Sequence, residues 1–355
     1  MHRKLPSTAG FALRYQLAKG AAPTPCLSLT DRPPMTAAQP TGQKTSETDS
    51  ASFEPTPHRF ETEEAAVRED RRRARRMRRV FRILTRLGRT NWTNMKDRLW
   101  LARQYPLGVP KPALNPDQIR ALAERLEDGV ASGLPPSTLG SSLRMRLIRL
   151  AFHRALFDAF APYADDDLRT LTVIYSGWAF SPADLDRTTA AKLQQQFRQH
   201  LNRIGVMKLP GPLIAVLHGE FEPTSGLYRL HFHILTTAEK AAALKAGLTT
   251  ETIKGYTVTA TGAAPVRRSQ VRDRDRQFTY LAQAFWPSRP VVIKHGKPKR
   301  TRRKHRIPEP FSTQVLLWLD CQPFADLVLL NDIWSPRKGG TAAMKRLYLL
   351  VKGMA

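Results

Sequence analysis

Two adjacent segments of the chain, Leu213–Glu222 and Leu227–Leu235, combine runs of hydrophobic residues with regularly spaced polar ones. Both segments are rich in residues that favour pleated, half-buried backbone. The Pro223–Gly226 stretch that separates them has the composition of a turn. The pattern therefore predicts a β-hairpin.

One face of this hairpin is expected to carry imidazoles and carboxylates. Alternate side chains of a strand share a face, so His218, Glu220 and Glu222 point the same way from the first strand. His231 and His233 share a face of the second strand. Two imidazoles and a carboxylate on one side of adjacent strands could hold a divalent cation. The alternative is a pair of solvent-facing histidines on an amphipathic strand.

The remaining patterns between residues 166 and 310 predict further strands and helices around the hairpin. The expected elements are a strand Leu168–Tyr175, a helix from Ser181 through Ile204, a helix Thr237–Leu248, a strand Gly255–Ala260 and a helix Ser269–Phe285. This order predicts an α+β fold in which helices cover one face of an antiparallel sheet.

An N-terminal helical extension is predicted for residues 63–165. Its first helix begins near Glu63, has a narrow hydrophobic stripe that includes Met77 and Val80, and carries ten arginines within 19 residues. Two further helices are expected, one after Asn115 and one over Ser137–Phe160. The arginines favour contact with a DNA or RNA backbone, and the alternative is a solvated helix that docks its stripe on the rest of the protein.

The two ends of the chain have a different character. Residues 1–62 are rich in Pro, Thr, Ser and Ala and are predicted to stay unfolded. The basic run Lys294–Arg306 is expected to form a loop that contacts phosphates, residues 311–334 to form a helical pair, and residues 335–355 to form a loosely docked basic tail.

Composition indicates the class of partner. The chain has 355 residues with 57 Lys and Arg against 30 Asp and Glu, which gives a net charge of +27 and implies a polyanion such as nucleic acid. Two distant cysteines, Cys26 and Cys321, suit a reducing cytoplasm. No hydrophobic run approaches the length that spans a bilayer, and no phosphate-binding loop of the helicase type is present in the sequence.

The segments Leu171–Tyr175, Gly219–Phe221 and His231–His233, followed by Tyr280 on an expected helix, resemble the HUH endonuclease superfamily. The order of the motifs is most similar to the replication initiator (Rep) type used in rolling-circle replication by plasmids and phages, which implies a bacterial cytoplasm. The resemblance covers residues 167–310, and its strongest motif is Arg229–Leu235.

The resemblance implies a ferredoxin-like nuclease core that nicks single-stranded or hairpin origin DNA, with host replication proteins as further partners. It assigns Mg²⁺ or Mn²⁺ to His231, His233 and Glu220, where the cation would act as a Lewis acid on a phosphate. His218 and Glu222, on the same strand face as Glu220, are expected as reserve ligands or as groups that orient the ligands. The resemblance assigns the nucleophile to Tyr280, whose attack would leave a 5′-phosphotyrosine and a free 3′-hydroxyl.

DNA contacts are expected from basic residues of the arginine-rich helix, the tyrosine helix and the basic loop. These are Arg71, Arg72, Arg73, Arg75, Arg76, Arg78, Arg79, Arg276, Lys294, Lys297, Lys299, Arg300, Arg302, Arg303 and Lys304.

The sequence departs from the Rep pattern at Gln283, where such initiators commonly carry a lysine three residues after the tyrosine. Arg276 and Lys294 are the candidates to supply the missing charge. Otherwise the chain is a non-catalytic DNA-binding protein, such as a degenerate Rep or a regulator. A relaxase or transposase with the same chemistry and an RNA-binding protein that uses the sheet face are further alternatives.

Overall fold

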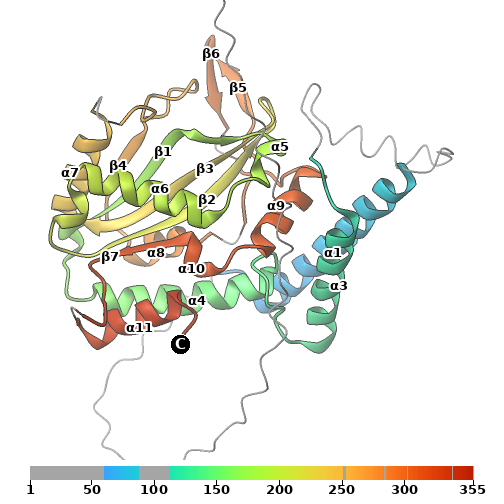
Figure 1. Cartoon of the computed structure of the whole chain (residues 1–355), viewed down its shortest axis with the longest axis horizontal. Helices are drawn as coiled ribbons and strands as arrows, with labels where there is room; N and C mark the ends of the chain where they lie inside the picture. Colours follow the sequence, from blue (N-terminus) through green and yellow to red (C-terminus); the bar gives the residue numbers. More distant parts are fainter. Residues whose placement is uncertain are drawn as a thin grey trace, which may run out of the picture. The chain divides into compact units, whose positions relative to one another are not determined.

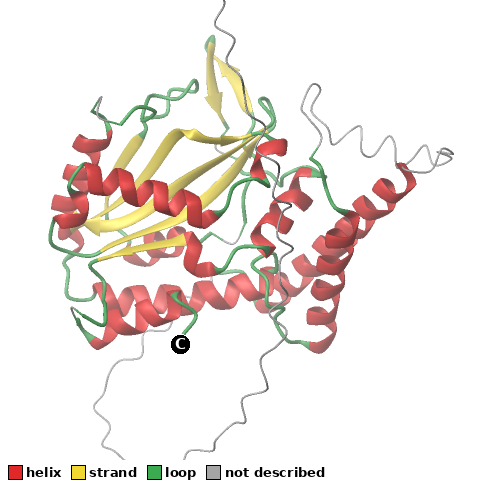
Figure 2. Cartoon of the chain, in the orientation of Figure 1, coloured by secondary structure: helices red, strands yellow, loops and turns green. Residues whose placement is uncertain are grey.

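The structure is a computed structural model of the chain that describes residues 60–87, 112–250, 253–283, 285–301, 303–337 and 339–354. An antiparallel five-stranded sheet with strand order β4-β1-β3-β2-β7 lies at its centre, and helices pack around it, so the fold is α+β (Figure 1, Figure 2). The strands of this sheet are β1 (Leu168–Phe180), β2 (Leu213–Glu222), β3 (Leu227–Thr237), β4 (Val266–Gln270) and β7 (Val328–Asn331). A separate two-stranded ribbon consists of β5 (Val291–Lys294) and β6 (Lys297–Arg300).

The helices follow the chain from the arginine-rich segment to the C-terminal region. They are α1 (Glu63–Leu87), α3 (Pro116–Ser132), α4 (Ser142–Phe160), α5 (Pro182–Leu185), α6 (Ala190–Arg203), α7 (Ala238–Leu248), α8 (Arg274–Leu281), α9 (Phe311–Asp320), α10 (Phe324–Leu327) and α11 (Ala342–Val351), with short 3-10 turns at Asp165–Asp167 and Val206–Lys208.

The predicted hairpin is confirmed as β2 and β3. Its register pairs Leu217 with Phe232, His218 with His231 and Val216 with His233, so the histidines lie on one face and Leu217 and Phe232 on the other. Gly226 takes a positive φ of 67° in the connecting turn, a conformation that glycine adopts without the steric cost of a side chain.

Helices cover both faces of the sheet, so the expectation that they lie on one face is wrong. Phe197 of α6 stacks on Phe232 at 4.5 Å between ring centroids. On the opposite side of the same strand, Tyr280 of α8 lies 4.6 Å from His233. Since neighbouring residues of a strand point to opposite faces, α6 and α8 pack against different sides of β3.

The N-terminal helices brace α8. The stripe of α1 is confirmed, because Met77 and Val80 are buried against α3. In α4, Arg149 donates a hydrogen bond to the carbonyl oxygen of Ala282 at 2.6 Å, directly after α8. His153 of α4 lies 3.0 Å from the Asp275 carboxylate at the start of α8. The extension therefore fixes the helix that carries the candidate nucleophile.

The segment predicted as one helix over Ser269–Phe285 has a different structure. Residues 266–270 instead pair with β1 as the edge strand β4, and Asp273 rather than Ser269 caps α8. The strand predicted over Gly255–Ala260 is loop and turn, and the helix predicted from Ser181 is interrupted after Leu185 before α6 begins. The sequence of β4, Val-Arg-Arg-Ser-Gln, has one apolar residue and no alternation, so it is paired as a strand through its backbone contacts with β1 rather than through a local pattern.

The C-terminal region also differs from the expectation. The first helix of the predicted pair is confirmed as α9, whereas the second, α10, is a single turn that leads into β7, which pairs with β2 at the sheet edge. The expected loose tail contains α11, whose Leu347 is fully buried in the core. Residues 1–59 of the region 1–62 that was predicted to be unfolded lie outside the described residues. Phe60 is buried beneath the Arg149 guanidinium. Within the described ranges, no helix has the length and apolar character needed to cross a membrane.

Candidate active site

Three histidines cluster on the face of the hairpin that α8 covers. The His231 and His233 rings lie 4.8 Å apart between centroids, and their Nε2 atoms approach to 3.2 Å. His218 lies 4.6 Å from His233 and 6.1 Å from His231 by the same measure. The sheet register brings the third imidazole to this pair, because His218 is the direct cross-strand partner of His231.

Burial keeps these imidazoles neutral. Removal from water lowers the pKa of His218 to about 3 and that of His231 to about 4, and it lowers the pKa of His233 well below its ordinary value. The positive charges of neighbouring imidazoles and of Lys304 act in the same direction. A neutral imidazole has a ring lone pair, which is the form that binds metal ions.

Backbone carbonyls determine which nitrogens carry the protons. Since a carbonyl oxygen only accepts, His231 donates from Nδ1 to the Arg229 oxygen, and His218 donates from Nε2 to the Leu281 oxygen. The lone pairs of these two rings are therefore on Nε2 of His231 and on Nδ1 of His218. The partner of His233 Nδ1 is the Thr172 hydroxyl at 3.1 Å, which is able either to donate or to accept.

The direction of the Thr172 hydrogen bond therefore decides whether Nε2 of His233 carries a proton or a lone pair. If the Thr172 hydroxyl donates to His233 Nδ1, the His233 Nε2 proton forms a hydrogen bond to Nε2 of His231. If the hydroxyl accepts instead, both Nε2 lone pairs face the same point between the two rings. A divalent cation needs the arrangement in which the Thr172 hydroxyl accepts, because both Nε2 atoms then offer lone pairs. Metal-binding histidines are commonly oriented in this way, by a hydrogen bond from the ring nitrogen that does not bind the metal.

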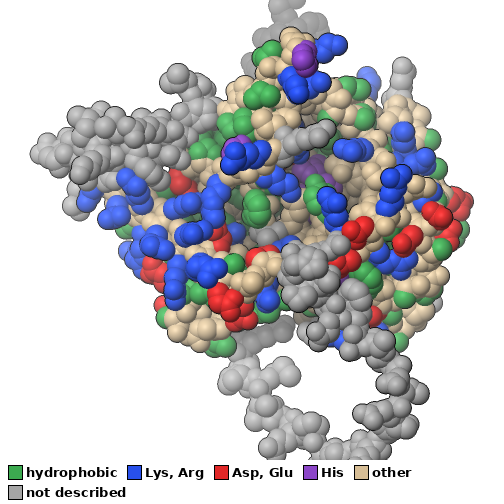
Figure 3. Space-filling model, turned by 180° about the vertical axis from the view of Figure 1, so that it is seen from behind, with side chains coloured by type: hydrophobic (Ala, Val, Ile, Leu, Met, Phe, Trp, Pro, Cys, Tyr) green, Lys and Arg blue, Asp and Glu red, His purple; other side chains and the backbone are tan. Residues whose placement is uncertain are grey.

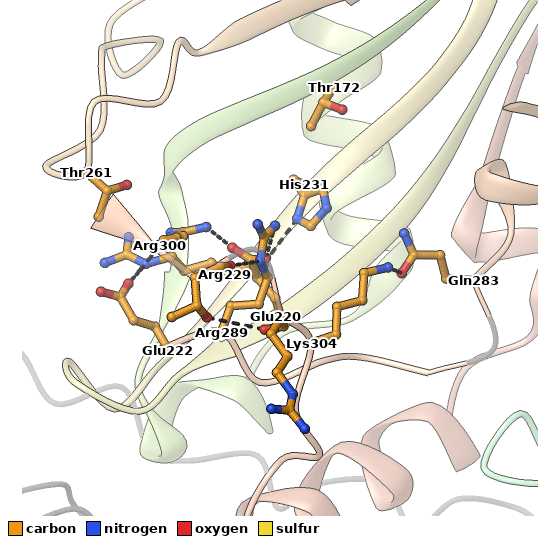
Figure 4. A network of polar contacts seen from close by, with 12 residues as sticks. Thr172, Glu220, Glu222, Arg229, His231, Thr261, Gln283, Arg289, Arg300 and Lys304 are labelled. Carbon is orange, nitrogen blue, oxygen red and sulfur yellow. Dashed lines mark hydrogen bonds and ion pairs between the residues drawn. The ribbon is translucent and has the colours of Figure 1, made fainter. Parts of the chain in front are cut away.

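Glu220 is committed to arginines rather than to the histidines. Its carboxylate forms an ion pair with Arg300, and Arg289 lies 3.5 Å away (Figure 4). The neighbouring Glu222 pairs with Arg229 and lies 3.6 Å from Arg300. The expectation that Glu220 completes the metal site is therefore not supported by this geometry. In the described ranges, no three His, Cys, Asp or Glu side chains are grouped in a way that could hold a metal ion.

Tyr280 lies on α8 directly beside the histidine pair. Its ring packs edge-on against His233, while 46% of the residue remains exposed. Phe278 and Leu281 are buried, as expected for the other side of the helix. Phe285, which was expected to join them, lies beyond α8 and is 47% exposed.

Lys304 places a positive charge beside both Tyr280 and Gln283. Its ammonium lies 5.3 Å from the centre of the Tyr280 ring and donates a hydrogen bond to Gln283 Oε1 at 3.2 Å (Figure 4). Partial burial, together with the guanidinium of Arg289, lowers the pKa of Lys304 from its ordinary value. Sequence spacing could not identify this lysine, because it lies 24 residues after Tyr280 and is brought close only by the return of the chain along β5 and β6.

Two cavities flank the His233–Tyr280 contact. The larger, about 510 Å³, is bounded by both histidines of the pair, Tyr280 and basic residues. The basic residues on its wall are Arg229, Arg267, Arg289, Lys299 and Arg300. The smaller, about 270 Å³, lies between β1, β4 and α8 and is bounded by Tyr280 and Arg276. Arg276 is thus next to the tyrosine as expected, whereas Lys294 lies on the β5–β6 ribbon.

The arginines of α1 divide into structural and surface groups. Arg73 is buried and donates to the Gly140 carbonyl at 2.7 Å, and Arg78 forms a bidentate pair with Glu127. These two are engaged within the protein. The other predicted contacts on this helix lie at its surface, fully or partly exposed: Arg71, Arg72, Arg75, Arg76 and Arg79.

The basic residues of the loop region are also largely at the surface. Lys294, Lys297, Lys299, Arg303 and Lys304 are exposed. Arg300 is half-buried in the ion-pair cluster with Glu220, and Arg302 lies outside the described residues. Figure 3 shows Lys and Arg side chains gathered on the face of the molecule on which histidine side chains are also visible.

Comparisons of the chain with models of known protein families, with curated protein sequences and with solved structures find no match.

Proposed function

We propose that this protein is an HUH-type endonuclease that nicks single-stranded DNA through Tyr280 and initiates replication of a plasmid or related element. The observation that carries the proposal is the packing of Tyr280 against His233, one of two neutral imidazoles whose Nε2 atoms face each other. A tyrosine with a purely structural role is usually buried, whereas 46% of the surface of Tyr280 is exposed beside a basic cavity.

The substrate class follows from charge and access. The cavity beside Tyr280 has arginines and a lysine on its wall, and such groups attract a phosphate backbone. A single strand is able to present one phosphate at the floor of a cavity, whereas the phosphates of an intact duplex are held on its outer surface. Single-stranded DNA is therefore the form that suits the site.

The chemistry assigned to the protein is a displacement at phosphorus. The oxygen of Tyr280 forms a bond to phosphorus, the bond to the 3′-oxygen breaks, and the phosphate becomes linked to the tyrosine. The phenol proton leaves to water on the exposed side of the ring, and the departing oxygen takes up a proton to become a 3′-hydroxyl. Lys304, next to the ring, stabilises the negative charge that develops on the attacking oxygen and on the phosphate.

The histidine pair is the part of the expected donor set that suits a divalent cation. His231 and His233 would hold the ion, with His218 as the nearest further imidazole, because Glu220 is paired with arginine. When bound, the cation would polarise a non-bridging phosphate oxygen. An all-imidazole set favours Mn²⁺ over Mg²⁺, which prefers oxygen ligands.

The test uses the full chain, a pool of fluorescent single-stranded oligonucleotides of randomised sequence, and Mn²⁺. We expect a covalent adduct that survives denaturing electrophoresis and is abolished by Tyr280→Phe. Tyr348→Phe is the matched control. Tyr348 lies on α11 and packs against Trp334, so its substitution should leave the adduct unchanged. An adduct of equal yield in Tyr280→Phe, or none from the wild-type chain, would refute the proposal.

A DNA-binding protein without nicking activity is the second candidate. The ion pairs of Glu220 favour it, because they withdraw the expected acidic ligand from the histidines. It predicts salt-sensitive DNA binding that is unchanged in His231→Gln and in Tyr280→Phe. The RNA-binding alternative has less support, since Phe221 and Phe232 are fully buried and offer no stacking surface.

A further inference from the structure

The β5–β6 ribbon is the most basic exposed feature near the candidate site. Residues 287–308 contain nine Lys and Arg and no acidic residue. Lys294, Lys297 and Lys299 are exposed and form no salt bridge with any residue in the described ranges. An acid-free run of this kind repels itself unless a polyanion lies against it.

The two faces of the ribbon differ in chemistry. Cross-strand pairing places Ile293 opposite Pro298 and Lys294 opposite Lys297, and these two pairs point to opposite faces. One face is therefore apolar and the other carries lysines. Ile293 is 72% exposed, so the apolar face packs against nothing else in the described parts of the chain.

The ribbon has a tight turn and a fixed base. His295 and Gly296 both take positive φ, which gives the two-residue turn typical of a short, well-defined hairpin. All residues from 292 to 299 are exposed, and a two-stranded ribbon without packing on either face gains little stability of its own. Its base is held by the ion pair of Arg300 with Glu220 and by backbone hydrogen bonds between Ser288 and His305.

This attachment connects the ribbon to the nicking site. Glu220 lies on β2 two residues after His218, and Lys299 and Arg300 bound the same 510 Å³ cavity as Tyr280. Figure 1 shows the ribbon projecting from the sheet at the end of β1 and β3. A nucleic acid that lies along the ribbon therefore continues into the cavity at Tyr280.

From this arrangement we infer that the β5–β6 ribbon is a DNA-opening element, an inference that rests on the proposed function and specifies its substrate as a junction between duplex and single strand. The lysine face binds the phosphates of the duplex end. The Ile293–Pro298 face inserts against the terminal base pair, because apolar side chains of this kind unstack neighbouring bases. The separated strand then enters the cavity beside Tyr280.

The experiment measures base opening without nicking. All proteins carry Tyr280→Phe and are assayed in EDTA with a forked duplex of 20 base pairs whose first pair at the fork contains 2-aminopurine. We expect the otherwise unmodified protein to raise the fluorescence of this base, and Ile293→Ala to remove most of the increase. Affinity for single-stranded dT20 should stay within twofold. Leu134→Ala, at an equally exposed leucine in the loop after α3, is the matched control and should retain the full increase.

A second variant tests the lysine face. Replacing Lys294, Lys297 and Lys299 by alanine should reduce the slope of log affinity against log salt on the fork by about 2.7, because each lost phosphate contact removes about 0.9. Equal base opening by Ile293→Ala, or an unchanged salt slope in the triple variant, would overturn the inference. Failure of the proposed function would instead appear as an absent covalent adduct and would leave both of these measurements unaffected.

Discussion

Acidification should destabilise this protein strongly, because the folded state holds its active-site histidines neutral. Burial lowers the pKa of His218 to about 3 and of His231 to about 4, whereas a histidine in the unfolded chain titrates near 6.5. Above pH 6.5 both states bind the same number of protons at these sites. As the pH falls below 6.5, the unfolded chain gains protons that the folded chain does not, so stability falls until the folded-state pKa is reached.

The size of the effect follows from the pH range below 6.5 over which the unfolded chain gains protons and the folded chain does not. Between pH 6.5 and pH 5.0 each of the two histidines lowers the free energy of unfolding by about 2 kcal/mol. Together they remove about 4 kcal/mol, and His233, whose pKa is also depressed, adds to the loss. A domain typically has only about 5–15 kcal/mol to lose.

Urea denaturation at pH 7.5, 6.0 and 5.0 in EDTA measures this loss directly. His231→Gln should reduce the loss between pH 7.5 and 5.0 by about 2 kcal/mol, since one titrating group is removed. His295→Gln, at the turn of the β5–β6 ribbon, is the control and should behave like the wild type. An identical pH dependence in the two variants would show that His231 is not held neutral by burial.

Further variants test the site and its support. Lys304→Met should slow adduct formation about 5- to 150-fold, because a cation 5.3 Å from the Tyr280 ring contributes about 1–3 kcal/mol after screening. Lys345→Met, which removes a similar contact between α11 and Trp334, should change the rate less than twofold. Glu220→Gln should lower the free energy of unfolding by about 3 kcal/mol, measured in urea, by leaving Arg300 without its main partner, yet leave Mn²⁺ affinity unchanged in calorimetry. Met77→Ala should cost about 2–5 kcal/mol in thermal or urea unfolding because the side chain is fully buried, whereas Arg78→Ala, at an exposed ion pair, should cost less than about 1 kcal/mol.

The hairpin and its histidines could be predicted from the sequence because they depend on local patterns. Strand alternation alone places His231 and His233 on one face, and the turn composition sets the pairing of β2 with β3. The helix start at Asn115 was likewise predictable, since its side chain accepts from the Asp117 backbone as a cap.

The ligand set and the charge near Tyr280 depended on contacts that sequence spacing does not encode. Glu220 shares the correct face, but Arg300 reaches it from 80 residues away and takes up its carboxylate. Lys304 reaches Gln283 in the same way. Strand alternation placed His218 on the shared face only as a reserve ligand, because two glutamates satisfied the same pattern, and the cross-strand register shows that it lies directly opposite His231.

The basic residues and the histidines of the candidate site respond to pH in different ways. The proposed phosphate contacts come from arginines, which stay charged across the accessible range, and from Lys304, whose pKa burial lowers from its ordinary value, so acidification removes neither charge. His218 and His231 bind protons in the folded protein only near pH 3 to 4, and burial also lowers the pKa of His233 well below its ordinary value. Acid inactivation between pH 6.5 and pH 4 must therefore follow the unfolding transition rather than protonation of the intact site. We therefore expect DNA binding to persist as the pH falls for as long as the protein remains folded. Binding and the circular dichroism signal should be lost with the same midpoint.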